Sequence, residues 1–344
     1  MWEKFLHSVI IALAPSPQRK HHRLEIILPK WYNQSKRKKA QSMTTTTPRA
    51  LILEAIENDI RNRKYNPMND VLFKFIFASE ERKQVTIDFL NAVLNRQGNT
   101  AIKDIQFKNN EIVPLYEDDK LTRFDVFCVA EDGTQIDVEV QVVNKKNMER
   151  RTLFYWSQMY LMNLTKGEKY QDLKPAITIN ILRYNLFPSE PFHSMYSIYN
   201  METGRRLNED MELHFLEVPK FQKKPLSEMT RIERWLAYFS NKLNQQEMEE
   251  LAMNEAAIQT AIDATNIFMQ DKDERLKYLN REMAIIDYES DKAAWIDEGR
   301  VEGRAQEKMA MILSMIKNGL DDMTISNIAS LPIETIQQER SKLS

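Results

Sequence analysis

The 344-residue sequence is poor in cysteine and glycine and has no long apolar stretch. Its single cysteine, Cys128, excludes an intramolecular disulfide and a structural zinc site built on paired cysteines. No apolar run is long enough to cross a bilayer. Only seven glycines occur among many methionines and glutamates, which favours helix-rich structure over a many-stranded sandwich. These features predict a protein of the reducing cytoplasm with no membrane span.

Positive charge is also scarce outside one segment. The formal net charge is −2, yet residues 1–42 hold nine Lys or Arg against two Glu, a net +7, so the remaining chain carries −9. A nucleic-acid-binding protein usually presents a basic face. Any such face must therefore be local.

Residues 1–44 differ in composition from everything that follows. The opening MWEKFLHSVIIALAPS has the lysine, short apolar run and small residues of a secretory signal, and a polar stretch with KRKK comes after it. Nothing downstream has the character of a secreted protein. We therefore expect residues 1–44 to be a disordered or spurious extension, with Met43 as an alternative start. A signal peptide or a basic arm for nucleic acid is the alternative interpretation.

The centre of the chain mixes helical and strand-like patterns. Apolar residues recur at helical spacing over 69–95 and over about 148–164. Strand-like runs are found at 105–108, 123–130, 135–143 and 175–184. The predicted order is helix, three strands, helix, strand. This order defines an α+β domain, which we place at 45–220.

Beyond about Met229 the pattern is helical almost to the end. We place an all-α region at 221–344, and its last segment, 309–343, is expected to form three short helices broken near Gly319 and Pro332. The two final helices, 324–330 and 333–343, could form a helix-turn-helix. The second offers few base-reading side chains, so we favour packing or homo-oligomerisation through these helices over DNA reading.

A hairpin carries the chemistry. With Glu131-Asp132-Gly133 as a three-residue loop, the strands at 123–130 and 135–143 pair so that Asp125 lies opposite Glu139. One face then holds Asp125, Phe127, Val129, Gln135, Asp137, Glu139 and Gln141, and the other holds only apolar side chains: Phe124, Val126, Cys128, Ala130, Ile136, Val138, Val140 and Val142. A shift by one residue would mix the two faces, which burial penalises.

Two carboxylates directly opposite one another repel unless they are solvated or share a cation. All-oxygen ligands of this kind suit Mg²⁺ or Mn²⁺ rather than zinc. The alternative is the solvent-facing polar surface of an antiparallel sheet, which the geometry alone favours slightly.

Five strings resemble, in order, the recombination-promoting nuclease and transposase family of the PD-(D/E)XK nuclease superfamily. They are NDVLFKFIF, FLNAVL, DDKLTRFDVFCVAEDGTQIDVEVQ, RRTLFYWSQMY and KGEKYQDLKPAITINIL. The strings cover about residues 66–190, and the EGRVEGR helix with its small helical end is similar to the family's tail. The resemblance implies a restriction-endonuclease-like α-β-β-β-α-β core, a mixed sheet flanked by helices.

The resemblance also implies a catalytic set. Asp125 corresponds to the aspartate of the PD element, although Phe124 replaces the proline. Glu139 corresponds to the acidic residue of (D/E)XK. Gln141 stands where the superfamily usually has lysine, and glutamine is usual in this branch. Asp125, Glu139 and the carbonyl of Val140 would then bind Mg²⁺, with Mn²⁺ as the alternative.

Further positions match the family outside this hairpin. Lys120 and Arg151 are candidates for charge or phosphate contact, since Gln141 brings no charge. Arg151 could equally pair with a carboxylate, and Tyr155 is expected in the core. Asp70 matches the aspartate that opens the first helix. It is a weak candidate for the metal site and more often an N-cap.

The resemblance implies a metal-dependent DNA endonuclease tied to recombination or a mobile element. The alternative is a catalytically weak or inactive nuclease fold that binds nucleic acid or a partner. The acidic net charge and Gln141 favour the second function, whereas Asp125 and Glu139 favour the first.

Overall fold

The computed structural model describes residues 48–112, 122–163, 167 and 169–343. The expected extension at 1–44 and Lys120 lie outside these residues. The chain divides into two compact units, Thr47–Asp297 and a second that contains Glu298–Ser344. Helix α10, Lys272–Lys317, belongs to both.

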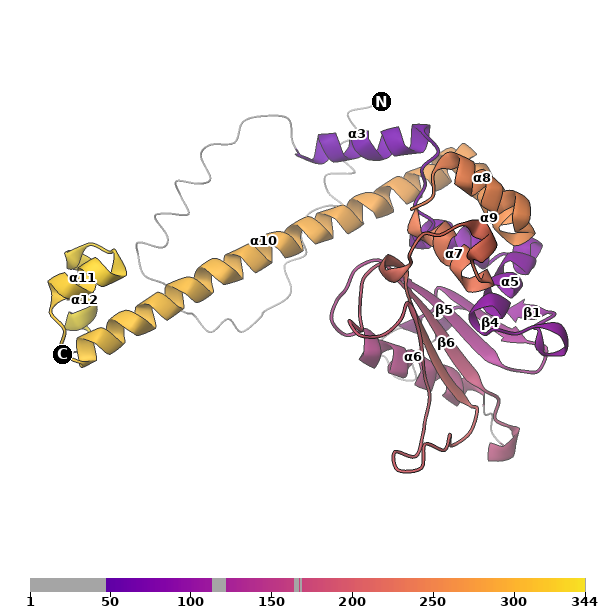
Figure 1. The fold of residues 1–344 in the computed structure, drawn as a ribbon, viewed down its shortest axis with the longest axis horizontal. Coiled ribbons are helices and arrows are strands. Elements are labelled where there is room, and N and C mark those ends of the chain that lie inside the picture. The colour runs from indigo at the N-terminus through magenta and orange to yellow at the C-terminus, as the bar shows by residue number, and fades with distance from the viewer. Residues whose placement is uncertain (1–47, 113–121, 164–166, 168, 344) are drawn as a thin grey trace. The chain divides into compact units, whose positions relative to one another are not determined.

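The first unit is built on a six-stranded mixed sheet (Figure 1). Its strands are β1 Ile105–Phe107, β4 Val126–Ala130, β5 Gln135–Gln141, β6 Ala176–Leu182, β7 His193–Tyr196 and β8 Met211–Glu217. Their order is β1-β4-β5-β6-β8-β7, in which β5, β6 and β8 run parallel and the other neighbours antiparallel. A separate pair joins β2 Glu111–Ile112 to β3 Thr122–Arg123.

Helices cover both faces of the sheet (Figure 1). Besides the first part of α10, the helices of the first unit are α3 Pro48–Arg61, α4 Asp70–Phe77, α5 Lys83–Val93, α6 Met148–Met162, α7 Arg231–Ser240, α8 Gln245–Asn254 and α9 Ala256–Gln270. Helix α6 packs on one face, where Tyr155 and Met159 contact Phe124 and Phe127. Helices α4, α5, α7, α8 and α9 contribute to the core on the other face. This is the α-β-β-β-α-β core with flanking helices that the sequence predicts.

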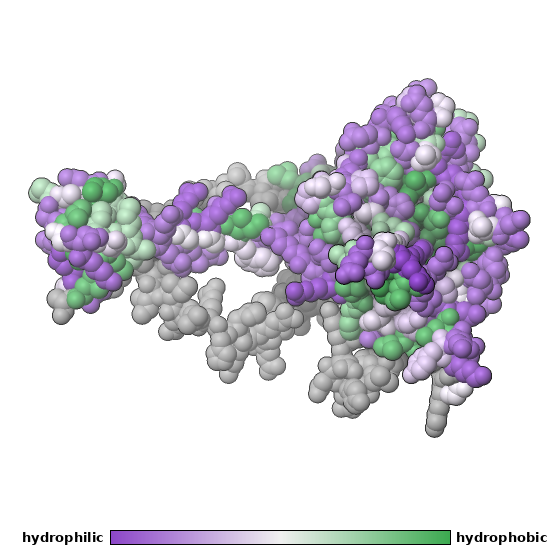
Figure 2. Space-filling view, turned by 60° about the horizontal axis from the view of Figure 1, so that its bottom comes forward, coloured by the Kyte–Doolittle hydropathy of each residue, from purple (hydrophilic) through white to green (hydrophobic). Residues whose placement is uncertain are grey.

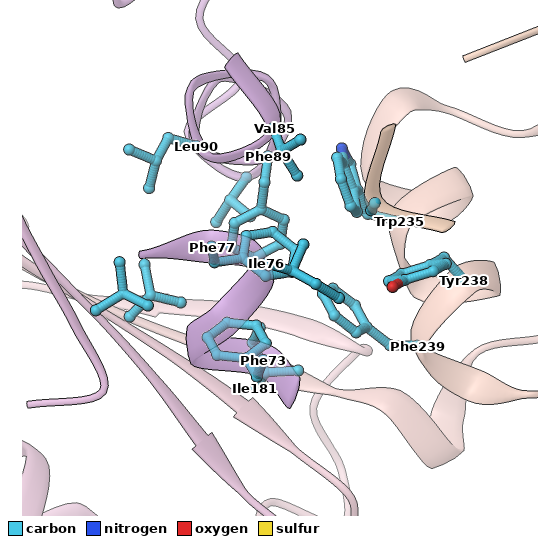
Figure 3. Close-up of a cluster of buried hydrophobic side chains, with 14 of the residues drawn as sticks. Phe73, Ile76, Phe77, Val85, Phe89, Leu90, Ile181, Trp235, Tyr238 and Phe239 are labelled. Atoms are coloured by element: carbon cyan, nitrogen blue, oxygen red, sulfur yellow. The ribbon is translucent and has the colours of Figure 1, made fainter. Parts of the chain in front are cut away.

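Aromatic side chains fill the core between α4, α5 and α7 (Figure 3). Phe77 contacts the rings of Phe73, Phe89, Trp235 and Phe239, with centroids 4.4 to 5.9 Å apart. Such rings bury large apolar areas and prefer offset or edge-to-face contacts. The apolar run of α4 is therefore the centre of this core. On the face in Figure 2, by contrast, hydrophilic side chains make up most of the described surface.

Local signals in the sequence fix several of these elements. The Asn69 side chain accepts hydrogen bonds from the Val71 and Leu72 N–H groups at the start of α4. Thr230 forms a capping box with Glu233 at the start of α7.

No helix among the described residues is long and apolar enough to span a membrane.

The predicted hairpin is confirmed. Gly133 has φ +89°, and its N–H donates to the Ala130 carbonyl at 2.9 Å. The Ala130 N–H donates to the Thr134 carbonyl, also at 2.9 Å. Val126 pairs with Val138, which is the predicted register. A left-handed residue at the end of this loop requires glycine, which is why the three-residue loop could be identified.

Two expectations for this hairpin are wrong. Strand β4 begins at Val126, because the chain bends at Asp125. The bend turns Phe124 to the face of the carboxylates, where it contacts Phe127 and Tyr155, and not to the wholly apolar face. The face that carries Asp137 and Glu139 is buried under α6 and is not the solvated surface of the alternative interpretation.

The region after residue 184 differs further from expectation. Strands β7 and β8 were not predicted, and β8 adds a third parallel strand to the sheet. In the part of the chain that the structure describes, all strands end before residue 220, where the sequence suggests a change of domain. Helices α7 to α9 nevertheless pack into the same core as α4 and α5, so the compact unit continues to Asp297. The domain boundary at 220 stays a prediction.

The second unit contains the end of α10 with α11 Asp322–Ala329 and α12 Ile333–Ser341. The first of the three expected short helices is the last part of the 46-residue α10. This helix ends at Lys317, just before Gly319, which has φ +78°. A small core joins the three helices: Ile312, Ile316, Ile325, Ala329 and Ile336.

Candidate active site

Two hydrogen bonds hold Asp125 close to the segment of Glu139 and Val140. The Asp125 N–H donates to Glu139 Oε1, and the Val140 N–H donates to Asp125 Oδ2, both at 3.0 Å. The second bond is possible because the last β4–β5 pair is Val126 with Val138, so Val140 lies beyond the β4–β5 ladder. The sequence placed these two carboxylates opposite one another, and the structure brings them together.

Arg151 joins Glu139 to Gln141. It lies in the first turn of α6, where its Nη2 donates to Glu139 Oε2 at 2.7 Å and its Nη1 donates to Gln141 Oε1 at 3.1 Å. Gln141 Nε2 donates back to Glu139 Oε2 at 3.3 Å. The guanidinium also lies over the Tyr155 ring, 4.8 Å from its centroid. Of the two roles considered for Arg151, the structure contains the carboxylate pair.

Lys74 is a site residue that the sequence reasoning missed. Its Nζ lies 2.9 Å from Asp125 Oδ1, so a cation from α4 reaches the bend that precedes β4. The sequence does mark Lys74 as unusual, because it is the one charged residue after Asp70 in the apolar run DVLFKFIF. Helical spacing could not show which strand end this side chain would meet.

Asp137 is a third carboxylate on the same face and is fully buried. Neither of its side-chain oxygens has a hydrogen-bond partner among the described residues. Burial, and then the charges of Glu139 and Asp125, raise its pKa well above the ordinary value. Alternation placed Asp137 beside Glu139, but the resemblance gave it no role.

The electrostatics of Glu139 follow the same pattern. Burial raises its pKa to about 8, Asp125 adds to the rise, and Arg151 opposes it. Burial of Tyr155 likewise raises the pKa of its phenol. The site therefore concentrates three carboxyl groups in a poorly solvated place, with Lys74 and Arg151 as the cations that offset them.

These residues fit a hard divalent cation by their chemistry. Asp125, Glu139 and the Val140 carbonyl supply only oxygen donors, as Mg²⁺ prefers, and Asp137 adds a buried carboxylate with unpartnered oxygens. In the described part of the chain, however, no group of three or more His, Cys, Asp or Glu side chains is arranged as a metal site. Instead, Lys74 pairs with Asp125 and Arg151 pairs with Glu139.

Asp70 takes a different position from the rest. It is the first residue of α4, and its Oδ1 accepts from Arg281 Nε on α10 at 2.7 Å. The cap of the helix is Asn69, so the structure gives Asp70 an ion pair in place of the expected N-cap. It takes no part in the hydrogen bonds described above for Asp125 and Glu139.

Replacing Asp137 by Asn should stabilise the metal-free protein. Folding raises the pKa of the Asp137 carboxyl. The folded protein therefore loses stability as the pH rises from the pKa of an unfolded aspartate, about 3.9, through the folded pKa. Asn removes that cost, and its amide can donate to Thr178 Oγ1, the unpartnered hydroxyl of the residue paired with Asp137. We expect a gain of about 1–3 kcal/mol in the free energy of unfolding at pH 8.

The gain should be smaller at pH 5, because the cost of the raised pKa grows as the pH rises above the unfolded value. Thermal unfolding of wild type and Asp137→Asn in EDTA at both pH values measures it. A loss of stability at pH 8, or the same gain at both pH values, would contradict this account of Asp137.

Comparison with known families identifies the fold. A family model described as PD-(D/E)XK nuclease family transposase matches residues 67–298, which include both α4 and the hairpin of Asp125 and Glu139. No curated protein and no solved structure matches the chain. The family match covers well over half of the sequence, and the sheet order and flanking helices agree with it. The chain belongs to the PD-(D/E)XK nuclease family transposases.

Proposed function

We propose that this protein is a metal-dependent DNA endonuclease that hydrolyses phosphodiester bonds during recombination or the movement of a mobile element. The observation that carries the proposal is the proximity of Asp125, just before β4, to Glu139 of β5, beside the guanidinium of Arg151 from α6. Family membership supports DNA as the substrate.

In this mechanism Asp125, Glu139 and the Val140 carbonyl would hold Mg²⁺ or Mn²⁺. When bound there, the cation would supply Lewis acidity to activate water and to offset the negative charge on the scissile phosphate. Burial of Glu139 excludes competing water and strengthens its electrostatic interactions. Arg151 fixes the orientation of Glu139 and Gln141 through its two hydrogen bonds.

A test of this function uses the purified protein and closed circular plasmid. We expect nicked and linear products with Mg²⁺ or Mn²⁺ and none in EDTA. Product in EDTA at the same rate would exclude a metal-dependent site. The absence of product with every divalent cation tried would favour the alternative function.

That alternative is an inactive nuclease fold that binds nucleic acid or a partner. Gln141 in the lysine position favours it, and so do the ion pairs that Lys74 and Arg151 make with the carboxylates. In this case the protein would bind plasmid DNA without cleaving it.

For the C-terminal unit we propose packing or homo-oligomerisation rather than base reading. The basic side chains of α12 and its end are neutralised, since Arg340 pairs with Asp322 and Lys342 pairs with Glu339. A DNA-reading helix keeps such side chains available for base edges and phosphates.

Gln141→Ala should slow cleavage by about tenfold. The amide can orient a water or phosphate oxygen, but a neutral group contributes less than a metal ligand or a cation. Single-turnover rates at saturating Mg²⁺ measure the effect. A loss as large as that of Glu139→Ala would mean that Gln141 has a more specific role.

A further inference from the structure

Position 141 lacks the positive charge that a lysine would bring, and its amide is already engaged. Gln141 Nε2 donates to Glu139, and its Oε1 accepts from Arg151. A neutral side chain held in this way brings no positive charge to offset the negative charge that develops on phosphate during hydrolysis. The charge must come from elsewhere in the site.

Arg151 is poorly suited to supply that charge. Its guanidinium donates hydrogen bonds to both Glu139 and Gln141 and lies over the ring of Tyr155. A planar group with three contacts is fixed, and turning it toward a phosphate would leave the buried Glu139 without its cation.

Lys74 has the properties that Arg151 lacks. Its Nζ pairs with Asp125 Oδ1, and its side chain is 31% exposed. Among the described residues, Asp125 is its one ion-pair partner. An ammonium on a flexible four-carbon stem can leave one oxygen for another nearby at little cost.

The backbone beneath Lys74 is rigid. Its neighbours Phe73, Ile76 and Phe77 are buried in the aromatic core, and Phe73 stacks on Phe77 (Figure 3). Helix α4 is also capped by Asn69. The helix therefore presents the stem of Lys74 from a fixed point beside Asp125, while the ammonium can move.

We propose that Lys74 supplies, from α4, the catalytic charge that Gln141 cannot supply from β5. In the nuclease reaction its ammonium contacts a non-bridging oxygen of the scissile phosphate next to Asp125. The proposal rests on the proposed nuclease function and assigns its missing cation.

The decisive experiment moves the charge between the two positions. Lys74→Gln should lower the single-turnover cleavage rate by about 10²-fold, the cost of losing one group that stabilises the transition state. The double variant Lys74→Gln with Gln141→Lys should recover at least about tenfold of that loss, because the charge returns to the same phosphate from β5. Lys83→Gln is the matched control: Lys83 is 34% exposed and paired with Asp104, and this change should leave the rate within about twofold.

A second readout is independent of turnover. Mn²⁺ binding to Lys74→Gln without DNA should be several-fold tighter than to wild type, because the ammonium no longer competes for Asp125. The melting temperature should stay within about 2 °C of wild type, since an ion pair of this exposure contributes little. Weaker Mn²⁺ binding would indicate a structural role and overturn the proposal.

The outcomes also separate this proposal from the function on which it rests. If Glu139→Gln abolishes cleavage while Lys74→Gln stays within threefold of wild type, the nuclease stands and the assignment of Lys74 fails. A loss in Lys74→Gln that the second change does not restore also overturns the assignment. A wild type that does not cleave DNA overturns both.

Discussion

Replacing Glu139 by Gln should reduce the single-turnover rate of DNA cleavage by about 10³-fold or more. The amide keeps the shape of the side chain but loses the charge that holds a divalent cation, and that cation is worth several kcal/mol in the transition state. Asp125→Asn should have an effect of the same size, because its carboxylate is the second half of the pair. Rates are measured at saturating Mg²⁺, with DNA affinity determined separately.

Folding must be separated from chemistry in this comparison. Glu139 is buried and bonded to Arg151, so the variant needs a melting temperature close to that of wild type. Glu212→Gln is the control, since Glu212 is a partly exposed carboxylate of β8 that also pairs with an arginine, Arg206. Retention of more than a tenth of the activity in both Glu139→Gln and Asp125→Asn would place the site elsewhere.

Phe77→Ala should have the largest effect on stability. Phe77 is buried at the centre of the aromatic core and contacts four other rings (Figure 3). Its removal leaves a cavity between three helices that cannot all close on it, which typically costs about 3–5 kcal/mol. Urea denaturation measures the change in the free energy of unfolding.

The matched control is Phe154→Ala, because Phe154 on α6 is exposed. That change should cost less than about 1 kcal/mol. Similar losses for the two variants, or a loss below about 1.5 kcal/mol for Phe77→Ala, would show that α4 is not the centre of the core.

The hairpin was predictable because two independent constraints agree on it. Gly133 fixes the loop, and alternation over β5 puts every apolar side chain on one face. The place of Phe124 was not predictable by the same means. Alternation assumes a continuous strand, and a bend at Asp125 reverses the face of the residue before it.

The charges around the carboxylates depend on tertiary structure. Arg151 could be placed on a helix after β5, but both of its roles fitted the sequence equally well. Lys74 is far from Asp125 in the sequence, and only the packing of α4 beside the sheet brings them together. The burial of Asp137 depends likewise on α6, which covers a face that alternation alone describes as polar.

Direct titration of Mn²⁺ tests the central claim, that Asp125 and Glu139 form a site for a catalytic divalent cation. Calorimetry compares wild type with the double variant Asp125→Asn and Glu139→Gln, each free of DNA and confirmed as folded. We expect saturable binding to wild type and at least a hundredfold weaker binding to the double variant. Equal Mn²⁺ affinity in the two proteins would contradict the claim.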